Sequence, residues 1–188
     1  MPGAAYNRDM NPAANLILVG PMGAGKSCIG RRLAVHYGLR LVDADREVEQ
    51  RTGVSVGTIF ECEGEAGFRE RERAVLADLL AEDGILLATG GGAVLDPANR
   101  TLLGARGYVV HLQVSPAQQL LRLARDKTRP LLQREDRQAV LEDMATRRGP
   151  LYAEVADLSF DTNGLATDDA TAELLDLLSS RWKRGAAA

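Results

Sequence analysis

The sequence predicts an α/β fold in which helices cover both faces of a mostly parallel sheet. Five short segments rich in Leu, Val and Ile alternate along the chain with segments that have helical patterns. The apolar segments are continuous rather than alternating, which is typical of strands that are buried on both faces. In folds of this class ligands bind beyond the carboxyl ends of the strands, so we expect functional residues directly after them.

The individual elements follow from local patterns. The predicted strands are LILVG from Leu16, LRLVDAD from Leu39, GILLATGGG from Gly84, GYVVHLQV from Gly107 and ADLSFD from Ala156. The predicted helices span residues 26–37, 65–80, 116–125, 137–148 and 171–182. Ser115 and Pro116 make a favourable helix start, because a serine side chain caps free amides and proline is tolerated at the first helical position.

Length and composition indicate one globular domain. The chain has 188 residues, of which 45% are hydrophobic and 26% are charged, and this suffices for one core with little room for a second. Both ends are small, polar or rich in Pro and Gly. We therefore expect a disordered tail over residues 1–14, a domain over residues 15–183 and a short tail over residues 184–188.

Charge and cysteine content narrow the range of partners. A net charge of -3 argues against a large surface for nucleic acid or anionic membranes. Cys28 and Cys62 lack metal-ligand spacing and cannot form a disulfide framework. No apolar run approaches the roughly 20 residues of a membrane span, and the N-terminus lacks the apolar core of a signal peptide. We expect a cytoplasmic monomer that acts on small molecules.

A phosphate-binding motif follows the first predicted strand. Residues 20–27, GPMGAGKS, match G-x-x-x-x-G-K-[ST] between a strand and a helix. In such a loop backbone amides converge on phosphate oxygens, the lysine reaches the β and γ phosphates, and the hydroxyl can bind Mg²⁺. We expect ATP contacts from Gly23, Ala24, Gly25, Lys26, Ser27 and Cys28. The alternative is a glycine-rich turn with an incidental lysine.

The rest of the chain favours a compact small-molecule kinase. It has no NKxD tetrapeptide to read guanine and no segment for the extra domains of a motor. Asp43 and Asp45 lie two residues apart, where an extended backbone would place both carboxylates on the same side. One could orient Mg²⁺ through water and the other could accept a proton from an attacking hydroxyl. The alternative is a solvated acidic turn that caps a following helix.

Glycines and arginines supply further candidates. Glycines at positions 90–92 follow a buried strand and can bring backbone amides against a small polar ligand, although a flexible loop would have the same sequence. Arg69 begins an amphipathic helix, and Arg129 lies in a polar segment that suits a lid over the transferring phosphoryl group. Arg147 and Arg148 are predicted at a helix end, where interaction with the helix dipole is the alternative explanation.

Taken in order, the segments from about residue 15 to residue 163 resemble shikimate kinases, which belong to the nucleoside-monophosphate-kinase-like P-loop group. The motifs that carry the resemblance are GPMGAGKS, DAD, FRERE, GGGAV, TRPLL and RRGPLY. The resemblance implies a three-layer P-loop kinase with a five-stranded parallel sheet in the order 2-3-1-4-5. It also implies transfer of the ATP γ-phosphoryl group to the 3-hydroxyl of shikimate, with Mg²⁺ as cofactor.

The resemblance also assigns roles to matching positions on the substrate side. Asp45 matches the carboxylate that holds the ring hydroxyls and can serve as base. Arg69 and Arg148 match the pair that grips the substrate carboxylate, a task suited to bidentate guanidinium groups. Gly91 matches the glycine whose backbone contacts the substrate.

On the nucleotide side, Ser27 corresponds to the magnesium ligand and Asp43 to its outer-sphere helper. Arg122 falls where an arginine can stack on adenine, and Arg129 matches the lid arginine near the phosphates. Two departures touch ATP binding: Cys28 replaces the usual threonine, and DTNGLATDD lacks an arginine that some members carry beside the adenine. The alternatives are a kinase for gluconate or an amino-substituted shikimate, and a nucleotide-gated regulatory module.

Overall fold

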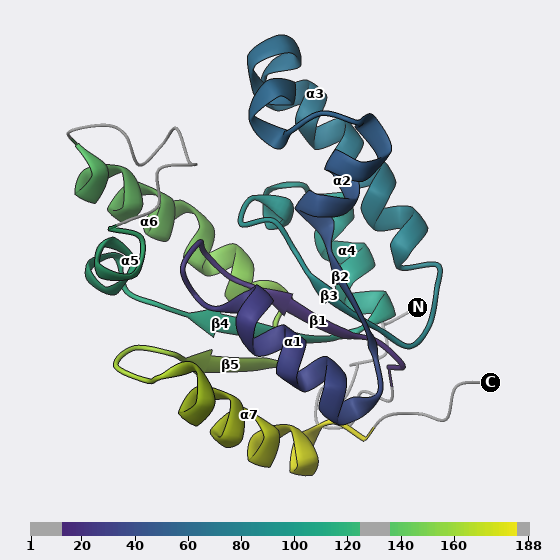
Figure 1. The fold of residues 1–188 in the computed structure, drawn as a ribbon, viewed down its shortest axis with the longest axis vertical. Helices are drawn as coiled ribbons and strands as arrows, with labels where there is room; N and C mark the ends of the chain where they lie inside the picture. Colours follow the sequence, from purple (N-terminus) through teal and green to yellow (C-terminus); the bar gives the residue numbers. More distant parts are fainter. Residues whose placement is uncertain (1–12, 125–135, 184–188) are drawn as a thin grey trace, which may run out of the picture.

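The computed structural model describes residues 13–124 and 136–183, and these residues contain one five-stranded parallel sheet (Figure 1). The strand order is β2-β3-β1-β4-β5, as the family resemblance implied, so the predicted fold is confirmed. The strands are β1 (Leu16–Val19), β2 (Arg40–Asp43), β3 (Ile85–Ala88), β4 (Tyr108–Gln113) and β5 (Leu158–Asp161).

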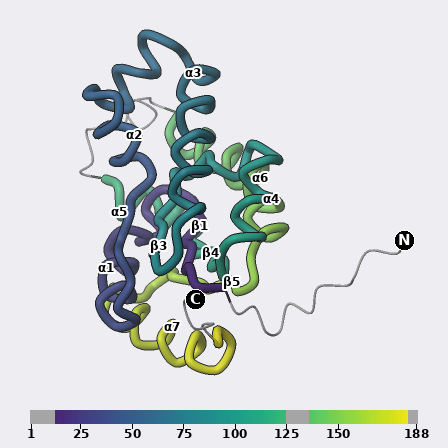
Figure 2. The backbone as a smooth tube through the Cα atoms, turned by 90° about the vertical axis from the view of Figure 1, so that its right-hand side faces the viewer, coloured from purple at the N-terminus to yellow at the C-terminus, as the bar shows by residue number. Residues whose placement is uncertain are grey.

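Helices cover both faces of this sheet. The described helical segments are α1 (Lys26–Tyr37), α2 (Ala44–Thr52), α3 (Val56–Leu79), the 3-10 turn η1 (Ala93–Leu95), α4 (Pro97–Arg106), α5 (Pro116–Arg122), α6 (Arg137–Val155) and α7 (Thr167–Arg181). Figure 2 shows α1 and α7 on one side of the sheet and α4 and α6 on the other. None of the described helices is long and apolar enough to cross a membrane.

The core consists of two layers because successive strand residues point to opposite faces. On β1, Leu16 and Leu18 pack with α1 and α7, whereas Ile17 and Val19 pack with α3 and α4. All four side chains are completely buried. The prediction of burial on both faces is confirmed for the central strands β3, β1 and β4, whereas the edge strands β2 and β5 have exposed residues.

Several helices were absent from the sequence prediction. Helix α2 has only two buried residues, Ala44 and Val48, so its apolar period is weak. Helix α3 begins nine residues earlier than position 65, and Gly64, with φ of 69°, divides it into two helical parts. The predicted helix at 65–80 corresponds to the second part. Helix α4 and the turn η1 were also missed.

Helix α6 corrects the predicted position of a helix end. The prediction stopped at residue 148, but the helix continues through Pro150 to Val155. Proline removes one hydrogen bond of the helix ladder. Burial of Tyr152, which is 2% exposed, stabilises the turn that follows. Arg147 and Arg148 therefore lie inside a helix and not at its end.

The remaining predicted helices correspond to α1, α5 and α7 to within about one turn. The tails predicted over residues 1–14 and 184–188 lie almost wholly outside the described residues. The proposed domain boundaries therefore stay predictions.

Candidate active site

The loop between β1 and α1 has a backbone that only glycine permits at key positions. Gly20 has φ of 142°, and a Cβ atom there would overlap the carbonyl oxygen of Leu112 on β4. Gly25 has φ of 95° and forms the N-cap of α1. This conformation leads directly into the amino end of α1, where free backbone amides favour an anion. The loop therefore has the form expected of a phosphate-binding loop.

Lys26 and Ser27 lie at the start of α1 and make contacts that fit phosphate and metal binding. The Lys26 Nζ atom donates to the carbonyl oxygens of Gly20 at 2.6 Å and Pro21 at 2.9 Å. The Ser27 hydroxyl donates to Asp43 Oδ2 at 3.0 Å. A hydroxyl beside a carboxylate supplies the hard oxygen donors that Mg²⁺ prefers. Cys28, one position further on, is exposed.

The two aspartates do not share one side of an extended chain, so that prediction was wrong. Strand β2 ends at Asp43, whose Oδ1 accepts hydrogen bonds from the backbone amides of Asp45 and Arg46 and caps α2. Asp45 consequently lies in the first turn of α2. Capping by Asp43 starts the helix at once and sends the Asp45 carboxylate toward the glycine loop after β3. The alternative of a capping turn was correct for Asp43.

Three consecutive glycines after β3 each lie against a different charged side chain. A Cβ atom at Gly90 would come within 2.6 Å of Asp45 Oδ1, and one at Gly92 would overlap the guanidinium of Arg69. At Gly91 the nearest atom would be Nη1 of Arg148, at 3.7 Å. The glycine loop, residues 90–92, thus brings together the side chains that the sequence predicted to bind substrate.

The glycine loop also lies beside the phosphate-binding loop. A Cβ atom at Gly91 would be 3.8 Å from both the carbonyl oxygen of Gly20 and the backbone nitrogen of Met22. Strands β1 and β3 are neighbours in the sheet, so the two loops leave it side by side. Groups on the glycine loop are therefore next to the expected phosphates.

Arg69 is held in place by Glu72, the last residue of the FRERE motif, to which the sequence prediction assigned no role. Arg69 Nη1 donates to Glu72 Oε2 at 2.7 Å, and Nη2 donates to Glu65 at 3.1 Å. Glu72 is 1% exposed, and burial raises its pKa while Arg69 opposes the increase. The signal that identifies Glu72 is its position on a buried helix face three residues after Arg69.

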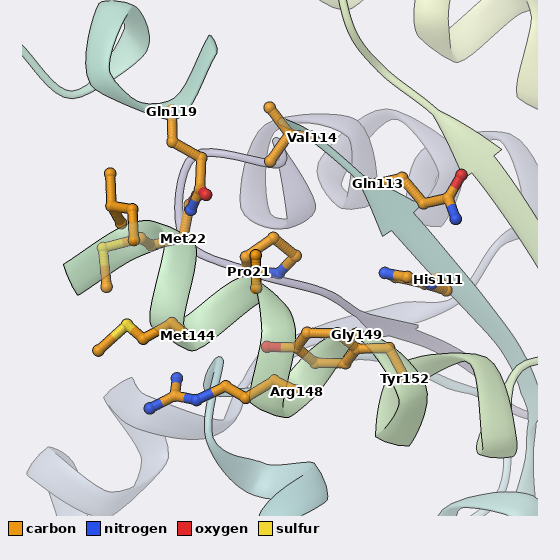
Figure 3. A pocket seen from close by; sticks show the side chains of 12 residues that line it. Pro21, Met22, His111, Gln113, Val114, Gln119, Met144, Arg148, Gly149 and Tyr152 are labelled. Carbon is orange, nitrogen blue, oxygen red and sulfur yellow. The ribbon is translucent and has the colours of Figure 1, made fainter. Parts of the chain in front are cut away.

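Arg148 borders a cavity of about 190 Å³ between the phosphate-binding loop, β4, α5 and α6 (Figure 3). The residues around it include Pro21, Met22, His111, Met144 and Tyr152. The Tyr152 hydroxyl donates a short hydrogen bond to the Gly91 carbonyl, and its ring packs on His111 with centroids 4.9 Å apart. The sequence prediction assigned no role to either residue, although Tyr152 ends the RRGPLY motif, because their interactions join residues far apart in the chain.

The two remaining arginines predicted for the nucleotide side have different outcomes. Arg122, on α5, donates from Nη1 to the Gly23 carbonyl at 2.9 Å and to Thr162 Oγ1 at 3.0 Å. It therefore connects the phosphate-binding loop to the end of β5, and adenine stacking stays a prediction. Arg129 lies outside the described residues.

Comparisons with known proteins agree with one another. The family model described as shikimate kinase matches residues 22–179. A shikimate kinase of Stenotrophomonas maltophilia (strain R551-3) is 58% identical over 175 residues, which are 93% of this chain and 97% of the relative. One of Xanthomonas oryzae pv. oryzae (strain PXO99A) is 55% identical over 178 residues, covering 95% of this chain and 99% of the relative.

Solved structures give the same result. Shikimate kinase from Acinetobacter baumannii in complex with shikimate has a TM-score of 0.84 and 47% identity, over 88% of this chain and 93% of that one. Shikimate kinase from Aquifex aeolicus has a TM-score of 0.76 and 31% identity, over 88% of this chain and 96% of that one.

Proposed function

Because the chain belongs to the shikimate kinase family, we propose that it transfers the γ-phosphoryl group of ATP to the 3-hydroxyl of shikimate. It is an ATP-dependent phosphotransferase that acts on an alcohol group. The observation that carries the residue assignments is the convergence of Asp45, Arg69 and Arg148 on three glycines beside the phosphate-binding loop. The solved relative that contains shikimate supports the choice of acceptor.

The phosphate-binding loop holds ATP in this proposal. Backbone amides of residues 23–28 bind the phosphates, and Lys26 exchanges its two loop carbonyl partners for oxygens of the β and γ phosphates. Ser27 would hold Mg²⁺ as a ligand, and Asp43 would assist from the outer sphere. When bound, Mg²⁺ neutralises charge that develops on the phosphate oxygens. The hydrogen bond between Ser27 and Asp43 supports this donor set.

The acid group of shikimate binds between two arginines on different helices. Arg69 comes from α3 and Arg148 from α6, and they approach neighbouring positions of the glycine loop. A planar guanidinium forms two parallel hydrogen bonds with a carboxylate, so the pair fixes both the position and the orientation of the ring. The backbone of Gly91 supplies a further contact, and Glu72 keeps Arg69 in place.

Asp45 takes the proton of the attacking hydroxyl. Its carboxylate lies beside Gly90, next to the positions of the glycine loop that Arg148 and Arg69 approach. A carboxylate there can bind the ring hydroxyls and accept the 3-hydroxyl proton as the phosphoryl group transfers. Most of the rate enhancement then comes from positioning and from charge stabilisation. Arg129 is proposed to add positive charge at the transferring group.

The remaining proposals concern the location and the oligomeric state of the enzyme. The free and exposed Cys28 and Cys62, together with small polar substrates, support a cytoplasmic enzyme. We propose that the enzyme acts as a monomer, because one chain contains every group assigned to the reaction.

The test is ADP release by the purified protein with MgATP and a panel of acceptors. Shikimate should stimulate release strongly, whereas gluconate, quinate, a nucleoside monophosphate and no acceptor should give only background. The Lys26→Ala variant measures contaminating activity and should stay at background with every acceptor. Stimulation by gluconate instead of shikimate would reassign the substrate. ATP binding without stimulation by any acceptor would favour a regulatory module.

A further inference from the structure

Tyr152 joins the helix that carries Arg148 to the centre of the glycine loop. Its hydroxyl donates to the carbonyl oxygen of Gly91, 61 positions earlier in the chain. The side chain is 2% exposed, so water does not compete effectively for this bond. The Gly91 carbonyl belongs to the planar peptide unit that ends in the Gly92 amide. The phenol therefore fixes the orientation of that whole unit.

Tyr152 also lies beside Arg148. The two residues are one helical turn apart on α6, a spacing that places side chains on the same face. Burial raises the pKa of Tyr152 to about 12, and the guanidinium of Arg148 is the strongest influence against this increase. The hydroxyl stays protonated at neutral pH and remains a donor. One phenol thus contacts the glycine loop and neighbours the proposed acid-binding arginine.

His111 packs against the Tyr152 ring. The two rings lie 4.9 Å apart between centroids, with an angle of 30° between their planes. His111 is 6% exposed, and among the described residues its Nδ1 atom has no hydrogen-bond partner. Packing against this buried ring holds Tyr152 in one orientation. The strand β4 thereby supports the hydrogen bond to Gly91.

We propose that Tyr152 is a positioning residue whose hydroxyl sets the Gly91 backbone and the adjacent Arg148 for the acid group of shikimate. This inference rests on the proposed function, because it assumes that Gly91 and Arg148 bind the substrate. The Tyr152 hydroxyl bonds to the glycine loop, whereas Lys26 bonds to carbonyls of the phosphate-binding loop, so the hydroxyl should influence shikimate binding and not ATP binding.

The Tyr152→Phe variant tests this inference, because it removes the hydroxyl and keeps the ring. Loss of a buried hydrogen bond leaves the Gly91 carbonyl without its donor, and we expect the KM for shikimate to rise about tenfold. The KM for MgATP should change by less than about twofold, as should kcat at saturating shikimate. A purely structural role would instead lower Tm and affect both substrates equally.

Tyr108→Phe is the matched control. Tyr108 is also buried, at 1% exposed, but it lies at the amino end of β4, away from the glycine loop. The KM for shikimate of Tyr108→Phe should match that of the wild type. If the wild type is active and Tyr152→Phe has an unchanged KM for shikimate, this inference is overturned while the proposed function stands. A wild type without shikimate-dependent ADP release would overturn both the proposed function and this inference.

Discussion

Glu72 shows how one buried carboxylate connects the two sides of the proposed shikimate site. One of its oxygens accepts from Arg69, while a Cβ atom at Gly90 would lie 2.8 Å from the other oxygen and 2.6 Å from Asp45 Oδ1. The nearby Asp45 raises the pKa of Glu72, in addition to the larger effect of burial. Glu72 therefore links the proposed acid-binding arginine, Arg69, to the proposed base, Asp45.

Single residues were predictable where a local motif defines them. Lys26 and Ser27 follow from the loop pattern alone, because that pattern requires both residue types at fixed spacing. Glu72 and Tyr152 end the FRERE and RRGPLY motifs, but the motifs did not show which groups they contact. The packing of His111 has no motif at all, because it comes from the folded structure. The orientation of Asp45 was also beyond the pattern, because capping by Asp43 changed the backbone between them.

His111 gives a prediction about pH. Burial lowers its pKa from 6.5 to about 4, and the Lys26 ammonium contributes in the same direction. Between these pH values the unfolded chain binds a proton that the folded chain does not, so the free energy of unfolding should fall as pH falls. By pH 4 His111 should contribute a loss of about 3 kcal/mol, and the loss becomes complete only below the folded pKa.

The measurement compares denaturant unfolding at several pH values between 4 and 6.5 for the wild type, His111→Gln and His36→Gln. His36 is the other histidine and is exposed, so its variant should keep the wild-type slope. His111→Gln should lose the part of the slope due to His111. Parallel curves for the wild type and His111→Gln would show that this ring does not control the acid response.

At the scale of elements, the sequence predicted the strands and helices that have strong local signals. It did not predict the features that depend on tertiary contacts. Continuous apolar strands and the helices α1, α5 and α7 matched the sequence closely. Helix α6 was predicted too short because Pro150 normally disfavours a helix interior, whereas burial of Tyr152 continues the helix here. Helix α2 was missed because its two buried residues give little periodicity.

The glycine loop yields a prediction at this scale. In Gly92→Ala the added Cβ would overlap the Arg69 guanidinium, which can move because it ends a long side chain. The backbone at Gly92, with φ of -103°, accepts alanine, so the fold should survive. The displaced arginine should raise the KM for shikimate by about tenfold or more, with the KM for MgATP unchanged.

Gly104→Ala provides the comparison in steady-state kinetics. Gly104 is an exposed helical residue of α4, and no atom lies within 4 Å of a Cβ atom placed there. Alanine should leave both KM values unchanged and stabilise the protein by about 0.5–1 kcal/mol. Equal KM values for shikimate in Gly92→Ala and the wild type would mean that Arg69 does not bind the acid from its present position.

At the scale of the whole molecule, the sheet order explains why distant segments form one site. Strands β2, β3 and β1 are consecutive neighbours, and Asp43, the glycine loop and the phosphate-binding loop lie at their carboxyl ends. The family resemblance predicted this order, but strand periodicity alone could not, because it contains no information on which strands pair. Helix α6 then brings Arg148 to the same edge from the distal half of the chain.

The central claim is that the glycine loop gathers an acid-binding pair next to the phosphate-binding loop. The most direct test is the KM for shikimate of Arg148→Ala compared with Arg147→Ala. Arg147 is the adjacent residue on α6, and its side chain is 74% exposed and paired with Asp143. The Arg147→Ala variant therefore removes the same charge at a position outside the proposed site.

Arg148→Ala should raise the KM for shikimate by about 30-fold or more, consistent with a loss of about 2 kcal/mol or more, while the KM for MgATP stays near the wild-type value. Arg147→Ala should leave both constants unchanged. A similar KM for shikimate in the two variants would contradict the proposed acid-binding pair.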